Sequence, residues 1–189
     1  MTGWALATAL AVGFSAPPAV AQAPAPFGKV PKSKVRTFVS PIGSFKIEYP
    51  ASGNWAVLPG PPGSVVALGE YKKGEALVVV ERVTLTEALA SDEMAQVADR
   101  EARIVKEREP GAAGLSQRVL DADTRKVIVL EYTRSGIQGP ERVVQYVIPQ
   151  GAALYRVVCM VVASQEAKYA PLFGHIAASI EPAPPKPAK

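Results

Sequence analysis

The chain has 189 residues, of which 48% are hydrophobic and 20% are charged. This apolar share is enough to bury a core, and it excludes a wholly disordered chain, which combines low hydrophobicity with high net charge. The formal net charge of +4 comes from the two ends of the chain, because residues 37–181 hold fewer Lys and Arg than Asp and Glu. A basic face for nucleic acid is therefore not expected.

The first 21 residues have the features of an export signal. An uncharged apolar run, Trp4 to Phe14, is followed by Pro17-Pro18 and then by Ala19-Val20-Ala21, which are typical of an apolar region, a helix breaker and a small-x-small cleavage site. The run is shorter than the about 20 residues that a membrane-spanning helix needs. We expect cleavage after Ala21, no integral membrane span afterwards, and a location in the periplasm or a thylakoid lumen. Because Met1-Thr2-Gly3 holds no Lys or Arg, a translation start further upstream and an uncleaved anchor are the alternatives.

Residues 22–36 are rich in Pro, Ala and Lys and are expected to form a flexible leader, as the Pro-rich residues 182–189 are expected to form a disordered tail. The basic side chains of the leader are the first candidates for partner binding, since they could contact an acidic protein surface or anionic lipid. A solvated linker is the alternative. The candidates are Lys29, Lys32, Lys34 and Arg36.

Four strands are expected before the first helix. A short strand at 37–40 is followed by one at 44–49, in which apolar and charged residues alternate. This period of two marks a strand with one buried face, and Pro50 is expected to end it. Two β-rich runs at 65–71 and 76–83 are separated by a Lys-Lys-Gly-Glu turn and predict a hairpin.

A loop stiffened by proline is expected at 58–63, after a tryptophan at position 55 that we expect to anchor the core. Because such a loop loses little conformational entropy on binding, Pro61 and Pro62 are further candidates for partner binding. The loop expected at 135–140 is another place where a partner could dock.

The first helix is expected over residues 92–109, where apolar residues recur at helical spacing. Ser91 is the expected N-cap, and Pro110 follows the end of the helix. Glu101 interrupts the apolar stripe. We therefore expect this helix to lie on the surface with one face buried.

Four more strands and a second helix complete the predicted order. The run Val157 to Val162 lacks alternation, which indicates a central strand covered on both faces. Arg125, Lys126 and Arg134 are expected to be solvated hairpin charges, and a basic patch at a partner interface is the alternative. The strands are expected at 116–122, 126–134, 141–148 and 153–163, and the helix, with a full apolar stripe, at 165–180. This order predicts an α+β fold, an antiparallel β-sheet of about six to eight strands flanked by helices.

Few residues suit catalysis. The single histidine, His175, falls on the side of the last helix away from the apolar stripe and is expected at the surface, and no G-x-S-x-G turn occurs. The single cysteine, Cys159, is expected to be a small buried hydrophobe. Asp121 and Asp123 are expected to shape a turn, because calcium needs six to eight oxygens and no D-x-D-x-D-G run is present. We expect no catalytic, metal-binding or cofactor-binding residue; a hydrolase whose carboxylates meet only in the fold is the alternative.

The start of the ordered chain has a distinctive order of residues. Phe38 is followed by the Gly43-Ser44 turn, by an alternating strand that ends in Tyr49-Pro50, and by Trp55. This order resembles the opening of the PsbP domain, and the order of strands and helices over 37–181 follows the same family. The resemblance implies a PsbP-like domain at 37–181, folded as an α/β/α sandwich around an antiparallel sheet.

The best-known PsbP-like proteins are extrinsic subunits of photosystem II that support calcium and chloride retention. None is known as an enzyme. The resemblance implies an exported, non-catalytic accessory protein, a monomer that binds a membrane-associated protein complex, and an extrinsic photosystem II subunit if the host is photosynthetic. Calcium is implied by the resemblance only, and no ligand residue is carried over. The alternative function is an extracytoplasmic carrier of a small ligand or lipid, held in an apolar pocket between helix and sheet.

Overall fold

The computed structural model describes residues 34–41, 45–70, 72, 74–122 and 125–183. The predicted export signal (1–21), most of the leader, Asp123 and the end of the tail lie outside the described residues. In chain order, the strands are β1 (Val35–Val39), β2 (Lys46–Pro50), β3 (Trp55–Leu58), β4 (Ser64–Glu70), β5 (Ala76–Thr84), β6 (Ala113–Ala122), β7 (Arg125–Gly136), β8 (Gly139–Gln150) and β9 (Ala153–Val162), and the helices are α1 (Met94–Arg108) and α2 (Glu166–Ala178), with a 3-10 turn at Ala163–Gln165.

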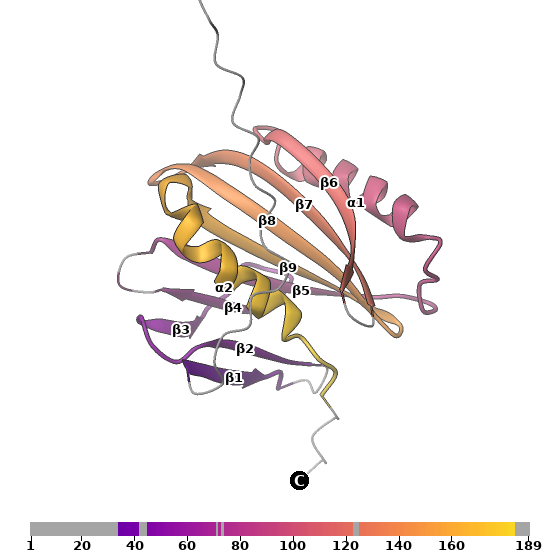
Figure 1. Cartoon of the computed structure of the whole chain (residues 1–189), viewed down its shortest axis with the longest axis horizontal. Helices are drawn as coiled ribbons and strands as arrows, with labels where there is room; N and C mark the ends of the chain where they lie inside the picture. The colour runs from indigo at the N-terminus through magenta and orange to yellow at the C-terminus, as the bar shows by residue number, and fades with distance from the viewer. Residues whose placement is uncertain (1–33, 42–44, 71, 73, 123–124, 184–189) are drawn as a thin grey trace, which may run out of the picture.

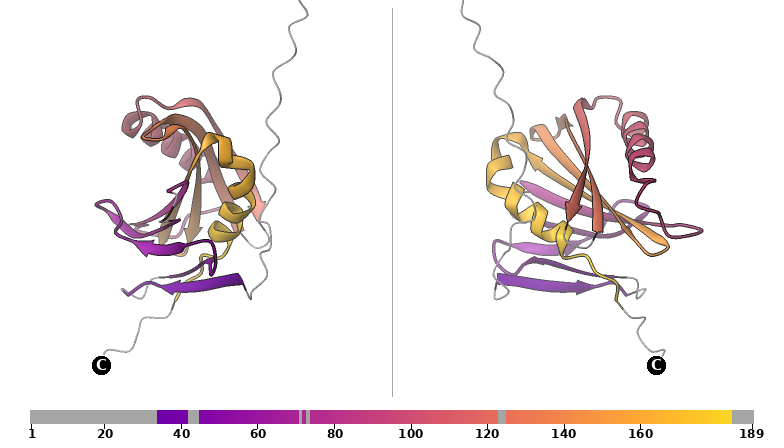
Figure 2. Two further views of the ribbon diagram at one scale, coloured as in Figure 1. Left: turned by 90° about the vertical axis from the view of Figure 1, so that its left-hand side faces the viewer. Right: turned by 45° about the vertical axis from the view of Figure 1, so that its right-hand side comes forward.

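Seven strands form one antiparallel sheet in the order β3-β4-β5-β9-β8-β7-β6, and β1 and β2 form a separate two-stranded ribbon (Figure 1). This confirms the predicted antiparallel sheet of six to eight strands. The two helices lie on opposite faces of the large sheet (Figure 2). The fold is therefore the expected sandwich, in which each helix buries its apolar side against the sheet.

The face of the sheet that α2 covers holds one apolar cluster. Phe173 of α2 and the alternate β9 residues Val157 and Cys159 belong to it. Phe45 and, on β2, Ile47 enter the same cluster and are fully buried. The two-stranded ribbon therefore closes the core on the α2 side. The apolar residues that alternate along residues 44–49 face this core, which explains why the sequence predicted a strand with one buried face.

The opposite face holds a second cluster beneath α1. Val97 and Val105 of α1 pack with Ile128 of β7 and Leu154 of β9, and Val158 of β9 packs against the same cluster. Because β9 lies between β5 and β8 and contributes to both clusters, it is the central, doubly covered strand that its lack of alternation predicted.

One strand and one hairpin end differ from the prediction. The strand β3 was not expected; it has only four residues and pairs with β4 in the register Trp55↔Glu70. The loop expected at 135–140 is instead the end of a hairpin, because β7 and β8 pair up to Gly136↔Gly139. Gly139 has a φ of 114°, a conformation that favours glycine.

The N-terminus of α1 also differs from the prediction. The helix begins at Met94 and not at residue 92, and Ser91 does not cap it. Glu93 precedes the first helical residue, and its carboxylate accepts a hydrogen bond of 2.8 Å from the backbone N–H of Ala90. Ser91 lies within the turn that this bond closes. The predicted stop before Pro110 is confirmed, since α1 ends at Arg108.

Candidate functional site

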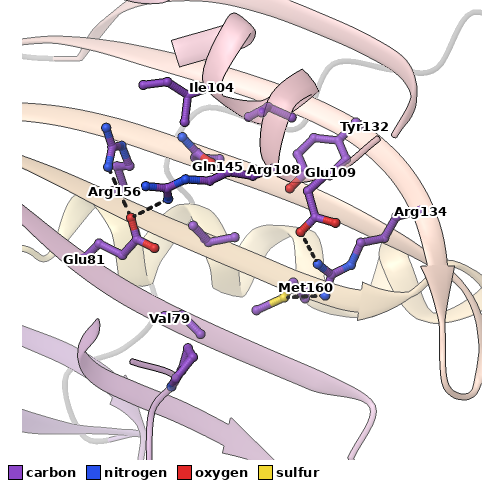
Figure 3. A pocket seen from close by; sticks show the side chains of 13 residues that line it. Val79, Glu81, Ile104, Arg108, Glu109, Tyr132, Arg134, Gln145, Arg156 and Met160 are labelled. Atoms are coloured by element: carbon purple, nitrogen blue, oxygen red, sulfur yellow. Dashed lines mark hydrogen bonds and ion pairs between the residues drawn. The ribbon is translucent and has the colours of Figure 1, made fainter. Parts of the chain in front are cut away.

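A cleft lies between the C-terminal half of α1 and the sheet (Figure 3). It encloses about 180 Å³, or about 650 Å³ when the space open to solvent is included. The floor is apolar, with Val79 of β5 and Val158 and Met160 of β9, while charged and polar side chains from α1, β5, β7, β8 and β9 line the walls. The cleft exists because α1 packs mainly over β6 and β7, so that Val158 and Met160 of β9 stay only partly buried.

A buried ion pair forms one end of this cleft. Glu101 of α1 is fully buried, and both of its carboxylate oxygens accept hydrogen bonds from Arg156 of β9, at 2.7 Å from Nε and 3.0 Å from Nη2. Arg156 also donates from Nη1 to Glu81 at 3.2 Å. Glu101, which interrupts the apolar stripe in the sequence, therefore lies inside the buried face of α1, where a bidentate partner 55 residues away neutralises its charge.

Burial and pairing act in opposite directions on Arg156. Burial lowers the pKa of its guanidinium, whereas the hydrogen bonds and charges of Glu101 and Glu81 raise it, and the net pKa is above its ordinary value. Arg156 is therefore charged at any physiological pH.

A second ion-paired group forms the other end of the cleft. Arg134 of β7 donates to Glu109 at 2.6 Å and to Glu141 at 2.9 Å, and its Nη2 lies 3.1 Å from the sulfur of Met160. The hypothesis that Arg134 is a solvated hairpin charge is therefore wrong. Between the two ends, Arg108 is 60% exposed and lies 3.4 Å from Glu81.

Tyr132 of β7 completes the wall. Its side chain is 3% exposed, and Figure 3 shows it on the same side of the cleft as Arg108 and Glu109. Burial and the negative charge of Glu109 raise the pKa of Tyr132 to about 12, although Arg134 acts in the opposite direction. The hydroxyl is therefore protonated at neutral pH and can donate a hydrogen bond.

The predicted partner-binding residues lie in two separate places. Lys34 and Arg36 are exposed at the start of the β1–β2 ribbon, and Pro61 and Pro62 are exposed between β3 and β4. Pro61 borders the cleft, whereas the ribbon packs on the α2 side of the sheet. The remaining two, Lys29 and Lys32, lie outside the described residues. Partner binding by these residues stays a prediction.

His175 is not at the surface, so that prediction is wrong. Its side chain is 12% exposed, and its Nε2 lies 3.1 Å from a carboxylate oxygen of Glu48. Ser179, one turn further along, accepts a hydrogen bond of 2.9 Å from the backbone N–H of Glu48. Because the β1–β2 ribbon covers this side of α2, a helix face that is polar in sequence becomes an interface.

A third polar group surrounds Tyr169 at the start of α2. Its hydroxyl donates to Glu70 at 2.5 Å, and Lys168 donates to that hydroxyl and to Glu75, both at 3.0 Å. Burial and the hydrogen bond to Glu70 raise the pKa of Tyr169 to about 12. These contacts join α2 to the β4–β5 turn, so we assign them to the fold.

The thiol of Cys159 is fully buried, and burial raises its pKa well above the ordinary value. The predicted role as a small core residue is confirmed. Within the described ranges, no group of three or more His, Cys, Asp or Glu side chains is arranged to hold a metal ion. No helix in the same part of the chain is long and apolar enough to cross a membrane.

Comparison with known proteins shows which solved structures have a similar fold. No family model matches the chain, and no curated protein matches it. The solved structure of cyanobacterial PsbP from Synechocystis sp. PCC 6803 is similar to it, with a TM-score of 0.61 and 16% sequence identity over 82% of this chain and 95% of that one.

Two further solved structures are similar over comparable shares of this chain. A protein from Bacteroides thetaiotaomicron has a TM-score of 0.56 and 14% identity over 82% of this chain and 51% of its own. LpqN of Mycobacterium tuberculosis, which is involved in cell envelope biogenesis, has a TM-score of 0.53 and 13% identity over 79% of this chain and 92% of its own. These likenesses show that the chain has a PsbP-like fold.

Proposed function

We propose that this PsbP-like chain is an exported, non-catalytic accessory protein that binds a membrane-associated protein complex. The observation that carries the proposal is the extent of the shared fold, which includes 82% of this chain and 95% of cyanobacterial PsbP. A protein of the same fold, LpqN, is involved in cell envelope biogenesis. The apolar run at the N-terminus supports export, because a helix breaker and a small-x-small cleavage site follow it.

The arrangement of charges in the fold suits recognition more than bond breaking. The charged side chains that line the cleft are held in ion pairs, as with Arg134 and Glu109 or Arg156 and Glu101. Other exposed cations lie away from the cleft, at Lys34 and Arg36 next to the rest of the basic leader. We propose that the leader contacts an acidic surface of the complex or anionic lipid around it.

The role of an extrinsic photosystem II subunit belongs to the proposal only for a photosynthetic host. The described residues do not fit a calcium site, since calcium takes six to eight oxygen ligands and no cluster of three or more suitable side chains occurs among them. The proposal therefore includes no bound metal.

Co-sedimentation with washed membranes of the native host tests the proposal, at low and high salt and with chemical crosslinking. We expect retention at low salt, release at high salt because exposed charges are screened, and a crosslink to one membrane protein. Glutamine at Lys29, Lys32, Lys34 and Arg36 should weaken retention, whereas glutamine at Lys186 and Lys189 in the tail serves as the control and should not. A protein that stays in the supernatant at low salt and forms no crosslink would refute the proposal.

A further inference from the structure

The cleft beside α1 has the features of a ligand site that the accessory role does not use. We propose that it binds a small neutral molecule with an apolar body and one hydrogen-bond acceptor. This inference is independent of the proposed binding to a membrane complex, and it gives a location to the ligand carrier that the sequence left as an alternative.

The volume and the apolar floor of the cleft suit a ligand with a small apolar body. Its volume of about 180 Å³ is below the about 300–1,000 Å³ of pockets for drug-sized ligands. Val158 and Met160 of β9 are only partly buried there, while Val79 beside them is 5% exposed. A flat apolar molecule that covers these side chains gains from removing them from water.

The charges around the cleft disfavour a charged ligand. Arg156 is held by Glu101 and Glu81, and Arg134 is held by Glu109 and Glu141. A charged ligand would have to break one of these pairs or lie beside a like charge, and an unpaired charge in a partly buried site is costly. A neutral ligand leaves these four pairs intact.

Tyr132 supplies the specific polar contact. It is 3% exposed and lines the cleft, and it makes no hydrogen bond to any residue in the part of the chain that the structure describes. The hydroxyl oxygen is not one of the fully buried atoms without a partner, so it is open to the cleft. A ligand that covers it without accepting a hydrogen bond would leave a polar group unsatisfied, which is costly, so a ligand that accepts this bond binds more tightly than one that only fills space. Arg108, exposed at the mouth, can move aside without loss of a buried contact.

The test uses the full chain and prodan, a neutral fluorescent naphthalene that carries one ketone. We expect saturable binding with emission shifted to shorter wavelength. Tyr132→Phe should weaken binding about two- to tenfold, the value of one neutral hydrogen bond. The matched control is Tyr146→Phe, which removes a hydroxyl from the opposite face of the sheet and should leave prodan affinity unchanged. The apolar N-terminal run is present in every variant, so dye bound there cancels in the comparison.

A second variant and a second dye complete the experiment. Val158→Trp fills the floor of the cleft and should abolish saturable prodan binding, with the fold checked by circular dichroism. The proposal is overturned if wild type shows no saturable binding, or if Tyr132→Phe binds prodan as tightly as wild type. If the anionic dye anilinonaphthalene sulfonate binds the same site more tightly than prodan does, the proposal that the ligand is neutral is overturned. Membrane retention can succeed or fail without changing any of these results.

Discussion

Glu101 and Arg156 join α1 to β9 by an ion pair inside the apolar contact. Removing two charges from water is costly, and the pair is tolerated because the bidentate geometry satisfies both carboxylate oxygens. The pair therefore holds α1 in one position over the sheet and sets one end of the cleft.

Replacement of Glu101 by Gln is expected to lower the free energy of unfolding by about 3 kcal/mol, because Arg156 loses its bidentate partner while it stays buried. Glu107→Gln on the exposed face of the same helix is the control, with an expected change within about 0.5 kcal/mol. Urea denaturation of both variants measures the difference. If Glu101→Gln and Glu107→Gln unfold at the same urea concentration, the buried ion pair contributes no more to stability than an exposed charge.

Tyr132 makes stability depend on pH in the alkaline range. Its pKa is about 12 in the fold and about 10 in an unfolded chain, so ionisation favours unfolding. The stabilisation is fully present below about pH 10 and is lost as the pH rises towards 12, at up to about 1.4 kcal/mol per pH unit. Urea midpoints between pH 9 and about 11.5 should therefore fall less steeply in Tyr132→Phe than in wild type. If the urea midpoints of both proteins fall equally with pH, the raised pKa of Tyr132 is contradicted.

At the scale of elements, the C-terminus of α2 is capped from the sheet. Arg125, the first residue of β7, donates to the backbone carbonyls of Ala178 at 2.8 Å and Ile180 at 3.1 Å. Ala178 is the last helical residue, so its carbonyl has no partner within the helix, and a cation suits the negative end of the helix dipole. The prediction that Arg125 is a solvated hairpin charge is thus wrong, because the end of α2 returns to the start of β7.

Replacement of Arg125 by Ala is expected to destabilise the fold by about 1–2 kcal/mol, through loss of two charge-assisted hydrogen bonds. The next residue provides the control. Lys126 makes an exposed ion pair with Asp121, and Lys126→Ala should change stability by less than about 0.5 kcal/mol. Thermal or urea unfolding separates the two, and similar losses in both variants would mean that the cap is not specific.

On the scale of the whole molecule, one sheet carries two cores. The α2-side cluster and the α1-side cluster share β5, β7, β8 and β9, so neither can loosen without disturbing the strands of the other. The β1–β2 ribbon, although it is a separate sheet, belongs to the α2-side core through Phe45 and Ile47.

Ile47→Ala should therefore destabilise the whole protein by about 2–5 kcal/mol, although it lies outside the large sheet. Val39→Ala in the same ribbon is the control, because Val39 is 47% exposed, and its effect should stay within about 0.5 kcal/mol. Unfolding of the Ile47 variant followed by near-ultraviolet and far-ultraviolet circular dichroism should give one coincident transition. Two separate transitions would show that the ribbon unfolds independently.

The sequence by itself determined the type of most elements, the doubly covered strand that contains Cys159, and the antiparallel order of a PsbP-like fold. These properties are local, since the period of the apolar residues and the turn residues between runs are visible within a few positions. The export signal and the partner-binding leader rest on the sequence alone and stay predictions.

Only the tertiary structure decided which polar side chains are buried and where the cleft lies. Glu101 meets Arg156 across 55 positions, and Arg125 meets Ala178 across 53, so no local pattern identifies either pair. The cleft arises because α1 covers only part of one sheet face, which depends on how two elements pack and not on the period of either. The burial of His175 has the same cause, since a separate ribbon covers the polar side of its helix.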